Sequence, residues 1–188
     1  RGFIKGESLQ KFVNEAVQNR PIERLNRTLA VVATDLQSGE MLVFRSGDTG
    51  LAVRASSSVP GIFQPMQLHG REYVDGGLVS PVPVGTAREL GADIVIAVDI
   101  SDKPKQGKLR DSIDVLMQTF TIMSRVIAGE ELKRADVVVE PDISNLNSAN
   151  FESRNYAIIE GEKAGLAAVP QIQQKIADYY ESRKTPPQ

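Results

Sequence analysis

A single acidic residue on a glycine turn is the feature of this sequence that most clearly suggests chemistry. Asp75 follows the apolar pair Tyr73-Val74 and precedes Gly76-Gly77. An acid placed this way is how an α/β enzyme presents a carboxylate to a cleft, because glycine allows positive-φ backbone and the close approach of another group. Such a carboxylate could be the base that activates a hydroxyl nucleophile. The alternative is structural, since Asp before Gly usually forms a turn by bonding to its own backbone.

The chain offers no clear nucleophile to accompany this acid. Ser56, Ser57 and Ser58 form a run, but they follow a predicted helix and lead into Pro60. A nucleophile elbow needs a strand, then Gly-x-Ser-x-Gly, then a helix. We therefore interpret the serines as small residues that allow close packing and cap backbone groups. The one histidine, His69, is interpreted as a solvated residue of a hairpin turn.

A different chemistry, metal-dependent phosphate hydrolysis, is the less favoured alternative. Asp35, Asp75 and Asp99 each end an apolar strand, and acids at strand ends could converge on Mg²⁺. The tight Asp-x-Asp spacing usual for such sites is missing. With one histidine and no cysteine, the sequence also excludes a multi-histidine or cysteine-ligated zinc site.

The elements expected upstream of Asp75 are helices and hairpins. Apolar residues at helical spacing predict a helix over 7–19. Residues 28–35 and 40–45 predict two strands joined as a hairpin, and residues 48–57 predict a short helix that stops ahead of Pro60.

Short extended segments at 66–68 and 72–74 surround His69-Gly70, whose composition suits a tight hairpin turn. Residues 82–90 predict a helix ending at Gly91, and 93–100 predict a buried parallel strand. The stretch from Val74 to Asp99 therefore reads as strand–helix–strand, which implies a parallel sheet with a right-handed crossover.

The C-terminal part is expected to be mainly helical. It contains a predicted helix over 111–134, a strand over 136–140, and two helices over 155–168 and 171–183, separated by Pro170. The fold class is therefore α/β, a three-layer sandwich in which helices cover a mostly parallel sheet.

The composition of the chain limits which binding partners are expected. A length of 188 residues is typical of a single domain. Hydrophobic residues make up 41% of the sequence and charged residues 24%, as in ordinary globular proteins. A net charge of −2 gives no electrostatic case for nucleic acid or an anionic membrane. Apolar runs such as 94–98 are too short to cross a bilayer. The basic segment 103–110 could touch a membrane peripherally, but Asp102 and Asp111 dilute its charge, which favours a solvated loop.

The order of motifs around Asp75 resembles one family. Arg54-Ala55-Ser56-Ser57-Ser58-Val59-Pro60-Gly61-Ile62-Phe63, a short hairpin, then Arg71-Glu72-Tyr73-Val74-Asp75-Gly76-Gly77-Leu78-Val79 and Pro81-Val82-Pro83 are similar to the C-terminal portion of the patatin-like phospholipases, particularly the bacterial branch related to neuropathy target esterase. The resemblance covers 28–101. Residues 111–183 resemble the family only in the order of their elements.

The resemblance implies the catalytic chemistry. Family members hydrolyse acyl esters with a Ser–Asp dyad, and Asp75 occupies the position of the catalytic aspartate. The Gly-x-Ser-x-Gly segment that carries the serine is absent from these residues, as is the Gly-Gly-x-Arg/Lys-Gly pattern of the oxyanion hole. The implied substrates are phospholipids, lysophospholipids or smaller carboxyl esters. No metal or organic cofactor is implied.

Expectations for the chain itself follow from the missing serine. It would form the C-terminal part of a single domain over residues 1–188, be inactive alone, and associate with its N-terminal half or with itself. A non-catalytic lipid-binding or interaction module of the same fold remains the alternative. The absence of cysteine fits the cytoplasm, which is favoured, or a secreted protein without disulfides.

Overall fold

The computed structural model describes residues 4–101, 111–143 and 154–184. The chain divides into two compact units, Arg1–Pro81 with Lys108–Ser124, and Val82–Gly107 with Arg125–Gln188. The basic segment 103–110 lies outside the described residues, so the interpretation of it as a solvated loop stays a prediction.

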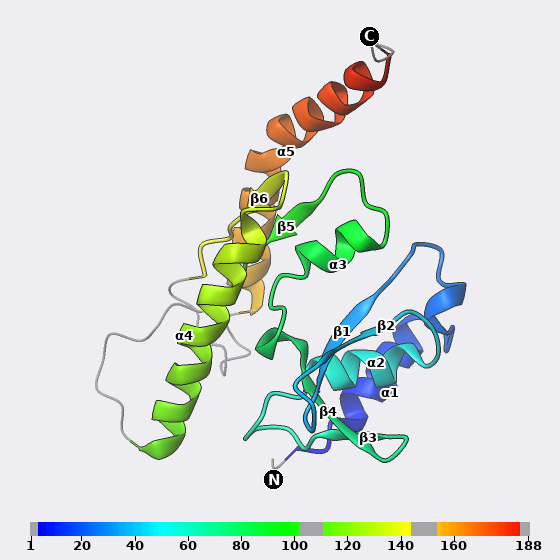
Figure 1. Cartoon of the computed structure of the whole chain (residues 1–188), viewed down its shortest axis with the longest axis vertical. Coiled ribbons are helices and arrows are strands. Elements are labelled where there is room, and N and C mark those ends of the chain that lie inside the picture. The colour runs from blue at the N-terminus through cyan, green and yellow to red at the C-terminus, as the bar shows by residue number, and fades with distance from the viewer. Residues whose placement is uncertain (1–3, 102–110, 144–153, 185–188) are drawn as a thin grey trace. The chain divides into compact units, whose positions relative to one another are not determined.

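The first unit is built on a four-stranded antiparallel sheet in the order β2-β1-β4-β3 (Figure 1). The strands are β1 (Val31–Asp35), β2 (Met41–Phe44), β3 (Met66–Leu68) and β4 (Arg71–Asp75). Both predicted hairpins are confirmed, since β1 pairs with β2 and β3 pairs with β4. His69 and Gly70, with φ of 50° and 78°, form the tight turn of the second hairpin.

Two helices of the first unit pack closely against each other. Helix α1 (Glu7–Ala16) ends before the predicted residue 19, because Gln18 and Asn19 adopt positive φ. Helix α2 (Thr49–Ser56) lies within the predicted range of 48–57 and has Asp48 as its N-cap. A Cβ at Gly50 would lie 2.2 Å from the Gln10 carbonyl oxygen, so only glycine allows this approach.

Helix α2 covers the central strand. All five residues of β1 are buried, and Ala33 forms a core cluster with Ala55 of α2 and with Met66 and Tyr73. A neighbouring core cluster contains the buried Ile22, which belongs to a short 3₁₀ turn, η1 (Ile22–Arg24), together with Val31 and Ala52. The core of this unit thus lies between α2 and the sheet that ends at Asp75.

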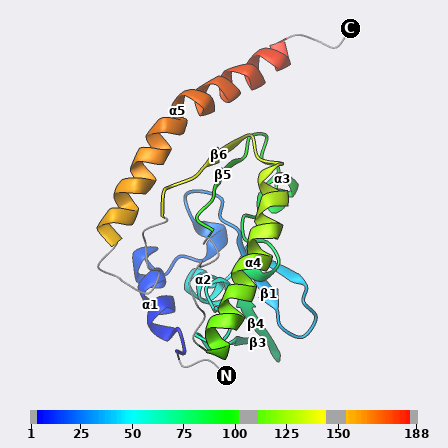
Figure 2. The same cartoon turned by 90° about the vertical axis from the view of Figure 1, so that its left-hand side faces the viewer.

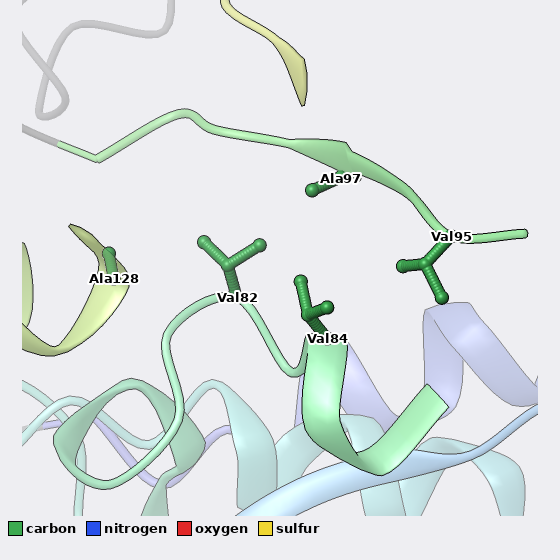
Figure 3. Packing of buried hydrophobic residues seen from close by; sticks show 5 residues of the cluster. All are labelled: Val82, Val84, Val95, Ala97 and Ala128. Atoms are coloured by element: carbon green, nitrogen blue, oxygen red, sulfur yellow. The ribbon is translucent and has the colours of Figure 1, made fainter. Parts of the chain in front are cut away.

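The second unit contains α3 (Val84–Glu89), β5 (Ile96–Val98), β6 (Val137–Val139) and α5 (Arg154–Lys184). Helix α4 (Ser112–Leu132) contributes its residues up to Ser124 to the first unit and the rest to the second. Figure 3 shows the core of the second unit, where residues in and just before α3 and β5 pack together with an alanine of α4. This cluster comprises Val82, Val84, Val95, Ala97 and Ala128.

The prediction of a mostly parallel sheet is not confirmed. Strands that follow each other through tight turns must run antiparallel, and β4 also pairs antiparallel with β1. The predicted strand–helix–strand unit from Val74 to Asp99 is wrong as well, because β4 and β5 belong to different sheets. Instead β5 pairs in parallel with β6, which follows α4.

Two further expectations need correction. Strand β5 is buried on one face only, since Ala97 is buried while Ile96 and Val98 are exposed. Pro170 does not separate two helices, because α5 continues through it (Figure 2). Ala164, Ala168 and Ile172 lie four residues apart on one face of α5 and all pack against β6, which holds both sides of the proline in one helix.

Among the helices within the described residues, none combines the length and the apolar composition needed to cross a lipid bilayer.

Candidate active site

Asp75 is the last residue of β4 and the N-cap of a short 3₁₀ turn, η2 (Gly76–Leu78). It faces Ala33 of β1 across the antiparallel pair. Its Oδ1 accepts a hydrogen bond of 2.7 Å from the Gly77 N–H. Within the described ranges this is the only hydrogen bond of the carboxylate, and no cation pairs with it there. One carboxylate oxygen is therefore available for another donor.

Gly76 is required by a close backbone contact rather than by positive φ, and Gly77 lies close to the Asp75 side chain. A Cβ at Gly76 would lie 2.3 Å from the Val32 carbonyl oxygen, and one at Gly77 would lie 3.0 Å from Oδ1 of Asp75. Neither glycine adopts positive φ, so that part of the sequence-based expectation is wrong. This close approach packs η2 against β1 and so fixes the position of Asp75 at the end of β4.

Burial raises the pKa of the Asp75 carboxyl above its ordinary value, and the hydrogen bond from Gly77 N–H offsets part of this rise. A carboxyl group with a raised pKa is a stronger proton acceptor when ionised. The site therefore combines a partly buried acid, one fixed oxygen and one available oxygen, which are features that suit a general base.

The serine run lies close to Asp75 but is used structurally. Ser58 is buried, and its hydroxyl donates to the Arg54 carbonyl at 2.7 Å. The Ser58 carbonyl in turn accepts the Asp75 N–H at 3.1 Å. Ser56 ends α2 and Ser57 is its C-cap. These contacts agree with the interpretation of the run as packing and capping residues.

The two remaining candidate acids have other partners. Asp35 is tied to Arg71 by an ion pair and accepts the backbone N–H groups of Gln37 and Ser38, so that its pKa is lowered to about 2, first of all by the bond from Arg71. Asp99 belongs to the other unit, where it accepts the Ser101 N–H. Among the described residues, no three acidic or histidine side chains gather in a way that could hold a metal ion.

Two hydroxyl groups that the sequence did not single out contact the Asp75 turn. Thr34 Oγ1 donates to the Asp75 carbonyl at 2.8 Å, and Ser124 Oγ of α4 donates to the Gly77 carbonyl at 3.2 Å. In the sequence, Thr34 stands out as a polar residue within the otherwise apolar run that forms β1, so its role could have been suspected. Nothing in the sequence distinguishes Ser124, because its contact with Gly77 depends on how α4 packs.

The antiparallel sheet bearing the Asp-Gly-Gly turn and the parallel β5–β6 pair define a mixed α/β protein. Residues 1–88 match the family model described as patatin-like phospholipase. An uncharacterized NTE family protein of Mycobacterium tuberculosis is 33% identical over 111 residues, which are 59% of this chain and 31% of the relative. A second NTE family protein of that organism is 27% identical over 192 residues, covering 89% of this chain and 33% of the relative.

A patatin-like phospholipase domain-containing protein of Caenorhabditis elegans is 33% identical over 126 residues, which are 66% of this chain and 9% of the relative. Residues 1–88 thus match the patatin-like phospholipase family, and the chain is similar to NTE family proteins over longer stretches, in agreement with the resemblance noted from its motifs. It spans about a third of the length of the mycobacterial relatives, whose coverage is 31% and 33%.

Proposed function

We propose that residues 1–188 form the C-terminal part of a single patatin-like domain in a serine acylhydrolase. In this proposal Asp75 is the base of a Ser–Asp dyad, and a Gly-x-Ser-x-Gly segment outside these residues supplies the nucleophile. The observation that carries the proposal is the state of Asp75, a partly buried carboxyl group with a raised pKa and one oxygen without a partner among the described residues. Both compact units would belong to this one domain.

The proposed chemistry proceeds in two stages. The free oxygen of Asp75 accepts the proton of the serine hydroxyl while the serine oxygen attacks the ester carbonyl. Collapse of the tetrahedral intermediate releases the alcohol, which takes that proton from Asp75, and leaves an acyl-enzyme. A water molecule then attacks the acyl group, with Asp75 accepting its proton and returning it to the serine. The proposed substrates are lipid acyl esters or smaller carboxyl esters.

A non-catalytic role in lipid binding or interaction is the second candidate. It is favoured by the large apolar side chains that stay exposed on α4, where Val115, Ile122 and Met123 are each about half exposed or more. The metal-dependent alternative has no comparable support, because Asp35 is engaged by Arg71 and by backbone amides.

The test uses the parent protein that contains both the Gly-x-Ser-x-Gly segment and this chain. Asp75→Asn keeps the shape of the side chain but removes the base, so turnover of a p-nitrophenyl ester should fall by a factor on the order of 10² or more. Asp75→Ala should behave alike and guards against Asn-Gly deamidation, which regenerates an acid.

His69→Ala is the matched control, because His69 lies in the β3–β4 turn and should be dispensable. Full activity of both Asp75 variants would refute the dyad. Strong inhibition by EDTA would favour the metal-dependent chemistry instead.

A further inference from the structure

The Asp75 turn is held at several atoms by segments distant in sequence. The Asp75 N–H donates to the Ser58 carbonyl, and the Asp75 carbonyl accepts from Thr34. At the far end of the turn, the Gly77 carbonyl accepts from Ser124. The two side-chain donors lie 41 and 47 residues away along the chain from the residues they contact. No local preference of the sequence brings these groups together.

Thr34 is an unusual residue for its position. Only 4% of it is exposed, and the strand around it is otherwise apolar up to Asp35. A buried hydroxyl group costs free energy unless it is hydrogen-bonded, and valine would have the same shape without that requirement. The Asp75 carbonyl is the acceptor that satisfies the hydroxyl of Thr34.

Ser124 differs from the two threonines of its helix. Thr119 and Thr121 donate to carbonyls one turn back, those of Val115 and Met117, which is the usual bond of such residues in a helix. Ser124 instead donates out of the helix to Gly77. One hydroxyl of α4 is thus directed at the turn that carries the candidate base.

We propose that Thr34 and Ser124 are positioning residues for Asp75, which hold the two ends of its turn through the Asp75 and Gly77 carbonyls. Neither hydroxyl touches the carboxylate itself. Their effect is on the backbone that fixes where the carboxylate points and how deeply it is buried. The kinetic consequence rests on the proposed function of Asp75, whereas the structural consequence does not.

The first experiment compares Thr34→Val with Thr34→Ser in the parent protein. Valine keeps the β-branched shape and removes the hydrogen bond, whereas serine keeps the hydroxyl and loses the methyl group. Positioning through the bond predicts that Thr34→Val lowers kcat about tenfold with little change in KM, and that Thr34→Ser retains most of the activity. A larger loss in Thr34→Ser than in Thr34→Val would mean that strand packing matters and would overturn the proposal.

The second experiment measures the ionisation of Asp75 directly in the 188-residue chain, by following its carboxyl carbon in an NMR titration. A loosened turn lets water reach the carboxylate, so Thr34→Val should move the pKa of Asp75 down toward its ordinary value. Ser124→Ala should move it in the same direction by less, and Thr119→Ala, the matched control in α4, should not move it. An unchanged titration in both Thr34→Val and Ser124→Ala would overturn the proposal.

The two experiments separate the possible failures. If Asp75→Asn stays active while the titration of Asp75 responds to Thr34→Val, the dyad is wrong and the positioning role stands. If Thr34→Val fails to fold, Ser124→Ala at a half-buried helix position gives the same readout and decides the outcome.

Discussion

Asp75 occupies an environment that disfavours its charge. Burial raises the pKa of its carboxyl, and the Gly77 N–H is the only donor to it among the described residues. A group whose pKa is higher in the folded chain than in the unfolded chain favours folding when it is protonated. That contribution is complete below the unfolded pKa and is lost as the pH rises through the folded pKa. Ionisation of the Asp75 carboxyl therefore lowers the stability of the fold at neutral pH.

Replacing Asp75 should reveal this cost. At pH 7 the Asp75→Asn chain should unfold at a temperature a few degrees higher than the unchanged chain, because the amide can still accept the Gly77 bond without carrying a charge. The difference should shrink toward pH 4, where the native carboxyl becomes protonated. Thermal unfolding followed by circular dichroism at both pH values measures it. A lower melting temperature for Asp75→Asn at pH 7 would contradict the burial argument.

Gly76 gives a second prediction at this scale. Alanine at Gly76 would place its Cβ 2.3 Å from the Val32 carbonyl oxygen, and backbone cannot move aside as a flexible side chain can. Gly76→Ala should therefore destabilise the chain by about 1–3 kcal/mol, as overpacking does. Gly129→Ala in α4, where a Cβ meets nothing within 4 Å, is the control and should be neutral or stabilising. If Gly76→Ala and Gly129→Ala unfold at the same urea concentration, η2 does not pack closely against β1.

At the scale of elements, Asp35 has the opposite electrostatic behaviour to Asp75. Its carboxylate closes the turn after β1 and joins β1 to β4 through Arg71. The bond from Arg71, the first cause, lowers the pKa of Asp35 to about 2. A lowered pKa in the folded chain stabilises it above the unfolded pKa, and this contribution is lost as the pH falls through the folded pKa.

Asp35→Asn should therefore be less stable than the unchanged chain at pH 7, and the gap should close as the pH is lowered from about 4 toward 2. Urea unfolding at pH 7, 5 and 3 measures the gap. Asp48→Asn is a useful comparison, because asparagine caps a helix about as well as aspartate. A gap for Asp35→Asn that does not depend on pH would show that the carboxylate acts by shape rather than by charge.

Elements with a local cause were predictable from the sequence. The hairpin at His69-Gly70 and the short helix ahead of Pro60 each depend on neighbouring residues, and both form as expected. The error over the sheet arose from applying a parallel pattern to strands that the predicted hairpins already made antiparallel. The continuity of α5 and the roles of Thr34 and Ser124 depend on contacts with distant segments, which periodicity does not report.

At the scale of the whole molecule, the described part of the chain leaves much apolar surface uncovered. On β5 the exposed fractions of Ile96 and Val98 are 43% and 53%, and on α5 that of Leu166 is 65%. Within the described residues β5 pairs only with β6, so one of its edges has no neighbouring strand. An open strand edge beside apolar side chains favours association with another chain or segment.

We therefore expect the isolated 188 residues to self-associate, and to show neither esterase activity nor labelling by a fluorophosphonate probe. Sedimentation velocity across a concentration series measures the association, and Val98→Lys should weaken it by placing a charge on the exposed face of β5. A chain that stays monomeric at every concentration would contradict the first expectation. Stoichiometric labelling would mean that a serine within these residues is activated, and the division of the dyad between two segments would be wrong.

The parallel pairing of β5 with β6 also bears on the order of folding. The register joins Ile96 to Val137, whereas both hairpins of the first unit join residues close in sequence. Bringing together strands about forty residues apart costs more loop-closure entropy than closing a hairpin, and non-local pairings form more slowly. The pairing of β1 with β4, which joins Ala33 to Asp75, spans a similar length of chain. All four strands of that sheet precede β6 in the sequence, so during synthesis the sheet that carries Asp75 can form before β6 has left the ribosome. Until then β5 remains an unpaired strand, whose apolar side chains and open edges favour association with other chains.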